Sequence, residues 1–169
     1  MERNLRGIRY FAYSLFIFLL YVISGVPNVI PELFGSKPCV LIPMALTIAV
    51  FENERVSMIF GAVCGILTDL GFSNTVGYFA VFLTVICFFI GFFSDNLIVG
   101  NLLNTMIISL CATVVLICLY FVFFYIFTGF ENAGQIFVNH YISRIIYTIV
   151  LVPAFYFLNR TLYFGLDKM

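Results

Sequence analysis

The sequence predicts an all-α membrane protein, a polytopic helical bundle with about six transmembrane helices, forming a single integral membrane domain over residues 1–169. The chain is 63% hydrophobic and only 9% charged, whereas soluble domains carry roughly 25% charged residues. Several apolar runs approach or exceed the roughly 20 residues that cross a bilayer as a helix, and weak polar–apolar alternation argues against a membrane barrel. The formal charge of zero leaves no basic surface for nucleic acid.

The first expected helix covers Tyr10–Val26 and follows a basic N-terminus. We interpret it as an uncleaved membrane helix rather than a signal peptide, because its apolar run exceeds a typical signal core and no clean cleavage site follows. A proline-rich connection leads to the second helix, Cys39–Phe51, where Pro43 predicts a tolerated kink. The next segment, Glu52–Arg55, concentrates three charges and is expected to reach water.

Four more helices are expected, at Val56–Leu70, Val76–Phe93, Leu102–Thr128 and Tyr141–Leu158. The second and third helices are short for a full span, which leaves two arrangements open: two complete crossings or a re-entrant pair. A re-entrant pair would leave the charges of Glu52–Arg55 at membrane depth, at a cost of a few kcal/mol per charge. That cost favours two complete crossings.

The basic residues predict the orientation of this bundle. Six spans place both termini on one side, together with most of the basic residues: Arg3, Arg6, Arg9, Arg55, Arg160 and Lys168. Lys37 and Arg144 fall on the opposite side. Because basic residues concentrate on the cytoplasmic side of membrane proteins, both termini are expected in the cytoplasm.

The sequence offers no constellation for catalysis or for binding a metal or cofactor. All five cysteines lie in apolar stretches without a C-x-x-C pair, which is typical of buried small hydrophobic residues. Ser57 or Ser109 as a nucleophile would lack a general base. The expected topology puts Asp69 outside and Asp95 inside, so the two carboxylates do not meet as in an aspartyl protease. His140 stands alone in an expected loop. We therefore expect no enzyme, no cofactor and no metal site.

Small residues recur along two consecutive expected helices. The third helix carries them at a four-residue step: Ser57, Gly61, Gly65 and Asp69. The fourth carries them at alternating steps of three and four: Gly77, Ala80, Thr84, Cys87 and Gly91. Helices in lipid associate by close packing over small residues, because the hydrophobic effect does not drive them together. The two stripes are expected either to face each other or to face two sides of one crowded bundle, and the short turn between them favours the first arrangement.

Asp69 ends the third expected helix. A bare carboxylate facing lipid would be costly, so its side chain is expected to face the protein interior. Its expected partners are the backbone amides of the following turn, or Ser73, Asn74 or Thr75. Two roles stay open, a group that organises the turn and a site for an ion or solute. Because Asp69 lies near the membrane interface, the structural role is favoured.

Residues 60–93 also carry a resemblance. The segment FGAVCGILTDLGFSNTVGYFAVFLTVICFFIGFF is similar to the central signature of MreD, the rod-shape-determining membrane protein of bacteria. In that family a short glycine-bearing helix ends in G-x-x-x-D, a small polar turn and a glycine follow, and the next helix ends in a glycine. Gly65, Asp69, Gly77 and Gly91 occupy those places here.

The resemblance implies a non-enzymatic scaffold subunit of the cell-elongation (rod) complex in the bacterial cytoplasmic membrane, supporting cell shape and peptidoglycan synthesis. Its implied partner is the single-span protein MreC. Through MreC it would be connected to MreB filaments, a SEDS-type glycosyltransferase and a penicillin-binding transpeptidase. The chain departs from the family at Glu52–Arg55, where a basic cluster is usual.

A second hypothesis is a small-solute-binding membrane subunit of a transporter. The MreD family resembles in general form the six-helix substrate-binding subunits of energy-coupling-factor transporters. Those subunits usually carry an Ala-x-x-x-Ala contact motif in the first helix, whereas here Ala12 is followed by Phe16 at the partner position. The motif is missing, so the scaffold hypothesis is preferred.

Overall fold

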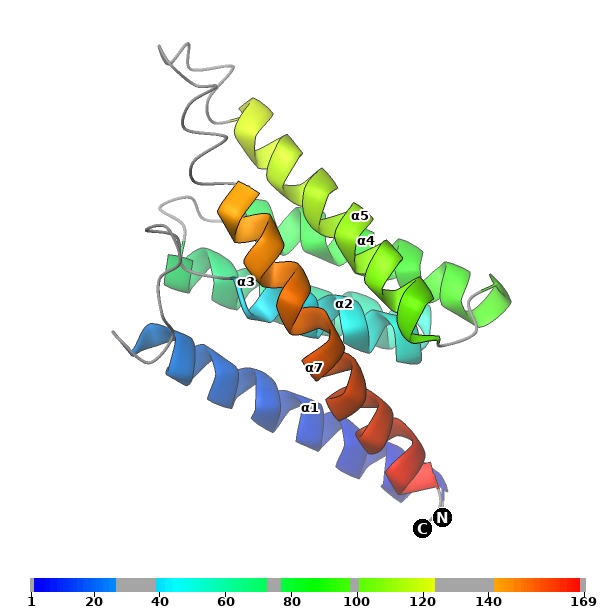
Figure 1. Ribbon diagram of the computed structural model, residues 1–169. Helices are drawn as coiled ribbons and strands as arrows, with labels where there is room; N and C mark the ends of the chain where they lie inside the picture. The colour runs from blue at the N-terminus through cyan, green and yellow to red at the C-terminus, as the bar shows by residue number, and fades with distance from the viewer. Residues whose placement is uncertain (1, 27–38, 73–76, 98–100, 124–141, 168–169) are drawn as a thin grey trace.

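The computed structural model describes residues 2–26, 39–72, 77–97, 101–123 and 142–167 (Figure 1). Within these ranges the chain forms six helices and no strand, which confirms the all-α prediction. The helices are α1 (Glu2–Gly25), α2 (Leu41–Phe51), α3 (Glu54–Phe72), α4 (Tyr78–Leu97), α5 (Leu102–Phe121) and α7 (Ile142–Asp167).

Four helices, α1, α3, α4 and α7, extend beyond their expected apolar cores. α1 begins at Glu2 rather than Tyr10, and α7 continues past Leu158 to Asp167. Hydropathy marks the part of a helix that suits the membrane, whereas the helix itself continues through the mixed polar and apolar residues that flank this part. The part of the expected helix Leu102–Thr128 that follows residue 123 lies outside the described residues.

α2 is the central helix of the bundle. Every residue from Leu41 to Val50 is buried, and α2 packs against α1, α3, α4, α5 and α7. A helix that is apolar on all sides is stable when other helices surround it. In Figure 1, α7 crosses in front of α2, while α1 runs along the edge of the bundle.

Pro43 lies in the first turn of α2 and does not interrupt the helix. It is the third residue of the helix, in the first turn, where backbone N–H groups have no intrahelical acceptor. Proline at this place therefore removes no helix hydrogen bond. The expected kink within the span is wrong, because the helix starts only two residues before Pro43.

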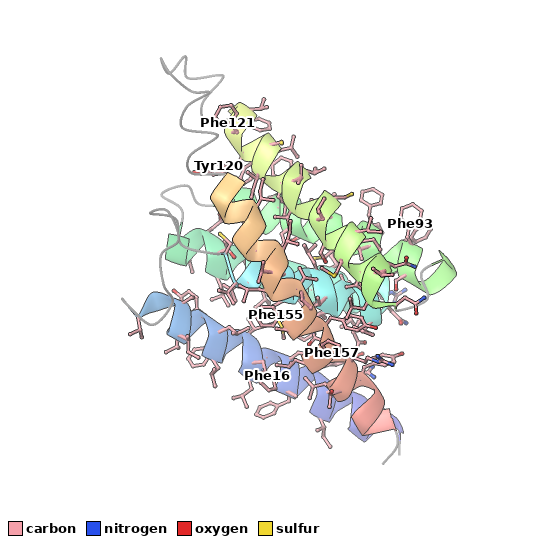
Figure 2. All side chains as sticks on the ribbon, in the orientation of Figure 1. Phe16, Phe93, Tyr120, Phe121, Phe155 and Phe157 are labelled. Atoms are coloured by element: carbon pink, nitrogen blue, oxygen red, sulfur yellow. The ribbon has the colours of Figure 1, made fainter. Side chains whose placement is uncertain are left out.

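Large apolar side chains remain exposed on the outside of the bundle, as Figure 2 shows for Phe93 on α4. α1 alone exposes many of them: Ile8, Phe11, Leu15, Phe18, Leu19 and Val22. Two segments of the described helices are long and apolar enough to cross a membrane, Gly7–Gly25 and Leu102–Phe121. Shorter apolar helices occur at Leu41–Phe51 and Tyr78–Ser94. An apolar exterior of this kind is suited to lipid.

The cysteines follow their prediction only in part. Cys39, Cys64 and Cys87 are buried, as expected for small hydrophobic residues. Cys111 and Cys118 are exposed on α5. A sequence that is apolar throughout a helix does not reveal which side faces the bundle, so the expectation of burial is wrong for these two residues.

Candidate functional site

The most extensive interface in the described structure lies between α3 and α4, and glycine brings the two backbones together. A Cβ atom added to Gly65 would lie 2.6 Å from both the Ala80 Cα and the Phe79 carbonyl oxygen. A Cβ on Gly61 would lie 2.8 Å from the Cys87 Cβ and 3.2 Å from the Leu83 carbonyl oxygen. These separations are too short for a side chain, so helix contact at these positions requires glycine.

The same contact continues to the other end of the hairpin. A Cβ on Gly91 would lie 2.8 Å from the Glu54 Cα and 2.8 Å from the Ser57 Oγ. Ser57 is buried, and its hydroxyl donates to the Glu52 carbonyl oxygen at 3.0 Å. Gly65 opposite Ala80, Gly61 opposite Cys87 and Ser57 opposite Gly91 define an antiparallel pair. The two small-residue stripes therefore face each other.

Gly77 has a different task from the other glycines of the motif. Its φ is +99°, in the left-handed region, and a Cβ there would meet no atom within 4 Å. Glycine adopts this conformation without the steric penalty that other residues incur. Gly77 thus sets the direction in which the chain enters α4, and close helix packing is not its role.

Asp69 caps the helix that follows its own. Its side chain is 2% exposed. Its Oδ2 accepts hydrogen bonds from the backbone N–H groups of Gly77 at 3.1 Å and Ala80 at 2.9 Å, and its Oδ1 accepts one from Phe79 at 3.1 Å. These amides lie at the N-terminus of α4, where N–H groups lack intrahelical acceptors and the helix dipole favours a negative charge.

Capping by Asp69 agrees with the expected inward orientation and with backbone amide donors; Gly77 ends the turn, while Phe79 and Ala80 belong to α4. The side chains proposed as alternatives, Ser73, Asn74 and Thr75, lie outside the described residues. An acidic residue at the end of one helix does not reveal from sequence which helix start it reaches. The structure supplies this information by placing the end of α3 beside the start of α4.

A second buried polar cluster joins three parts of the chain far apart in sequence. The Arg9 Nε lies 2.7 Å from the Glu52 Oε1, and the Arg9 Nη2 donates to the Glu52 Oε2 at 3.1 Å. The Tyr13 hydroxyl donates to the Glu52 Oε1 at 3.4 Å. The Arg9 guanidinium lies over the ring of Tyr163 at 4.6 Å. One hydrogen bond and one close ion-pair contact thus join the guanidinium to the carboxylate, and a hydrogen bond between charged groups is stronger than one between neutral groups.

This cluster corrects the expectation that the whole segment Glu52–Arg55 reaches water. Glu52 is 4% exposed and Arg9 is 7% exposed, while Arg55 is exposed. A buried carboxylate is tolerated because a cation and a hydroxyl satisfy it. Sequence reasoning missed the pair, since Arg9 and Glu52 are 43 residues apart. The only available signal was a charge at the end of an otherwise apolar run.

The cluster also places three chain segments at one end of the bundle. Arg9 is in the N-terminal part of α1, Glu52 connects α2 to α3, and Tyr163 is near the end of α7. In Figure 1 the first turns of α1 and the last turns of α7 lie at the same end of the bundle.

The described residues contain no group of three or more His, Cys, Asp or Glu side chains that could hold a metal ion. Asp69 lies near the end of α3 and Asp95 near the end of α4, which are opposite ends of the antiparallel pair. His140 lies outside the described residues. The two buried acidic groups described above, Asp69 and Glu52, are both engaged in joining helices.

Comparison with known families gives one match. The family model for the rod shape-determining protein MreD matches residues 6–162. The chain belongs to the MreD family. Membership supports a role in determining rod shape, and together with the two long apolar helices it supports a membrane protein. No curated protein and no solved structure matches the chain, and the resemblance to transporter subunits is not confirmed.

We expect Gly65→Ala to lower the accumulation and thermal stability of the protein. The added methyl group would lie 2.6 Å from the α4 backbone, so the two helices must separate along their seam. Gly7→Ala in α1 is the matched control, because its added Cβ meets no atom within 4 Å. Protein level in membranes and the midpoint of thermal unfolding measure the difference. Equal behaviour of the two variants would contradict the close contact of α3 and α4.

We expect Arg9→Glu and Glu52→Arg each to destabilise the protein, by about 3–5 kcal/mol, because each leaves like charges buried together. The double variant Arg9→Glu/Glu52→Arg restores opposite charges and is expected to recover part of the loss. Arg55→Glu, at an exposed position, is the control and should be mild. Unfolding midpoints of the purified proteins provide the measurement. A double variant no more stable than the worse single variant would argue against the ion pair.

Proposed function

We propose that this protein is a non-enzymatic scaffold subunit of the bacterial cell-elongation complex, a single integral membrane domain that binds MreC within the cytoplasmic membrane. The match to the MreD family over residues 6–162 carries this proposal. Through MreC, the protein would help to connect MreB filaments with a SEDS-type glycosyltransferase and a penicillin-binding transpeptidase, and so support cell shape and peptidoglycan synthesis.

The chemistry of the buried groups supports a scaffold. Asp69 accepts hydrogen bonds from three backbone N–H groups at the start of α4, and Glu52 is bound to Arg9 and Tyr13. Both carboxylates hold helices in position relative to one another. A scaffold that presents a fixed helical surface in the membrane needs polar contacts of this kind between its helices. The hydrophobic effect does not drive helices together in lipid.

Purification of the tagged protein from native membranes tests this function. We expect MreC to co-purify with it. Recovery of a transporter ATPase module in place of MreC would instead support the solute-binding alternative. As a matched control, the same purification from cells that lack MreC shows which other proteins depend on it for their association.

The proposed topology has both termini in the cytoplasm. Two observations support it, the excess of basic residues at the termini and the convergence of Arg9, Glu52 and Tyr163 at one end of the bundle. Reporter fusions after Met169 and near Arg55 are expected to report cytoplasm, and fusions near Ser36 and Gly134 the outside. An extracytoplasmic signal near Arg55 would refute this topology.

Asp69 provides a test of how the scaffold works. Asparagine at this position keeps one of the two oxygens that accept from the amides at the start of α4, so Asp69→Asn is expected to preserve MreC binding and cell shape better than Asp69→Leu. Asp69→Leu leaves those buried amides unpaired, at roughly 1–3 kcal/mol, and is expected to fail. Complementation of a rod-shaped cell depleted of its MreD, with protein level measured alongside, compares the two variants.

Equal loss of shape for both variants at normal protein level would contradict the capping role. It would show that the charge itself is required, as in a cation-binding or proton-carrying carboxylate.

A further inference from the structure

Buried uncharged polar side chains gather on three helices of the bundle, α2, α5 and α7. Each is at most 1% exposed: Thr47, Thr105, Ser109, Thr113, Thr148 and Asn159. The three helices pack against one another in pairs. α2 and α5 contain no Asp, Glu, Lys or Arg. The described buried polar side chains of these three helices are therefore uncharged.

Six Ser and Thr hydroxyl groups in the described helices donate to the carbonyl four residues earlier. This is the usual arrangement for Ser and Thr in membrane helices. It is made by Ser14, Thr47, Thr68, Thr84, Thr105 and Thr161. Ser109 and Thr113 depart from it. Their hydroxyl oxygens are buried and have no hydrogen-bond partner.

Ser109 and Thr113 lie one helical turn apart on the buried face of α5, which also includes Thr105, Ala112 and Leu116. Residues four apart in a helix lie on the same side. The two unpartnered hydroxyl groups thus point from one face of α5 into the interior of the bundle, and neither is on a side that faces lipid.

Asn159 on α7 adds a third unpartnered atom. Its Nδ2 donates to the Thr47 Oγ1 at 2.7 Å. The Thr47 hydroxyl itself donates to the backbone, with the Pro43 and Met44 carbonyl oxygens at 2.8 Å and 2.9 Å. Because the hydroxyl hydrogen is directed to the backbone, the Thr47 oxygen is left to accept, which fixes the orientation of the amide. The Asn159 Oδ1 is then buried without a donor.

We propose that ordered water molecules lie within the bundle and supply the missing partners of Ser109, Thr113 and Asn159. A buried polar group without a hydrogen bond costs free energy, and proteins commonly satisfy such groups with internal water. A water molecule can form the hydrogen bonds that all three side chains lack. It donates to the amide oxygen and can both donate to and accept from the hydroxyls. An ion is disfavoured, because the described buried polar side chains of α2, α5 and α7 are all uncharged and could not neutralise it.

The sign of one stability change tests the proposal. Thr113→Val removes the hydroxyl and keeps the shape of the side chain. If water binds Thr113, the variant loses that bond and unfolds at a temperature a few degrees lower than the unaltered protein. If the hydroxyl has no partner, its replacement by a methyl group leaves the midpoint unchanged or raises it.

Thr68→Val is the matched control. Thr68 is equally buried, and its hydroxyl donates to the Cys64 carbonyl of its own helix at 2.7 Å, so its loss is expected to change the midpoint little. Thr113→Ser, which keeps the hydroxyl, should be closer to the unaltered protein than Thr113→Val. All proteins are measured as full chains in lipid nanodiscs.

A midpoint for Thr113→Val that is equal to or above that of the unaltered protein would overturn the proposal. So would a loss no larger than that of Thr68→Val, because it would mean that Thr113 binds only its own helix. If Thr113→Val does not accumulate, Ser109→Ala is measured against the same control and judged by the same two outcomes.

Discussion

The direct contact of the α3 and α4 backbones is the constraint on which the rest of the described structure depends. Lipid surrounds apolar side chains as favourably as another helix does, so burial alone does not hold a membrane bundle together. Glycine at Gly61, Gly65 and Gly91 removes the side chains that would separate the two helices. Asp69 then joins the end of one helix to the start of the other through three hydrogen bonds. The α3–α4 pair then provides a continuous surface against which α2 packs.

An ion pair and its hydrogen bonds hold α1 at the edge of the bundle. α1 exposes much of its apolar surface and packs on its neighbours less extensively than α3 packs on α4. Its buried polar contact is the group formed by Arg9, Tyr13, Glu52 and Tyr163. A charge pair in a low-dielectric environment interacts more strongly than in water, and its directional hydrogen bonds fix geometry that apolar contacts leave free. Helices with few contacts can thus still have a defined position.

The contacts between α3 and α4 could largely be predicted from the sequence, whereas the contacts elsewhere in the bundle could not. The small residues of both stripes recur at helical spacing, and Asp69 ends one of them, so facing stripes and an inward carboxylate could be predicted from order alone. The Arg9–Glu52 pair could not, because the two residues belong to different helices and each looks like an ordinary interfacial charge. The unpartnered Asn159 oxygen could not either, since its state depends on where the Thr47 hydroxyl donates.

The sequence by itself determined the helical class, the membrane environment and membership of the MreD family. The physical reason is that composition and periodicity depend on the solvent around a helix and on its own backbone, which are local properties. Only the tertiary structure decided which helix is central, which amides Asp69 binds, and which charges leave water. Those outcomes depend on which helices meet, and a one-dimensional pattern of apolar residues leaves open which side of each helix meets which neighbour.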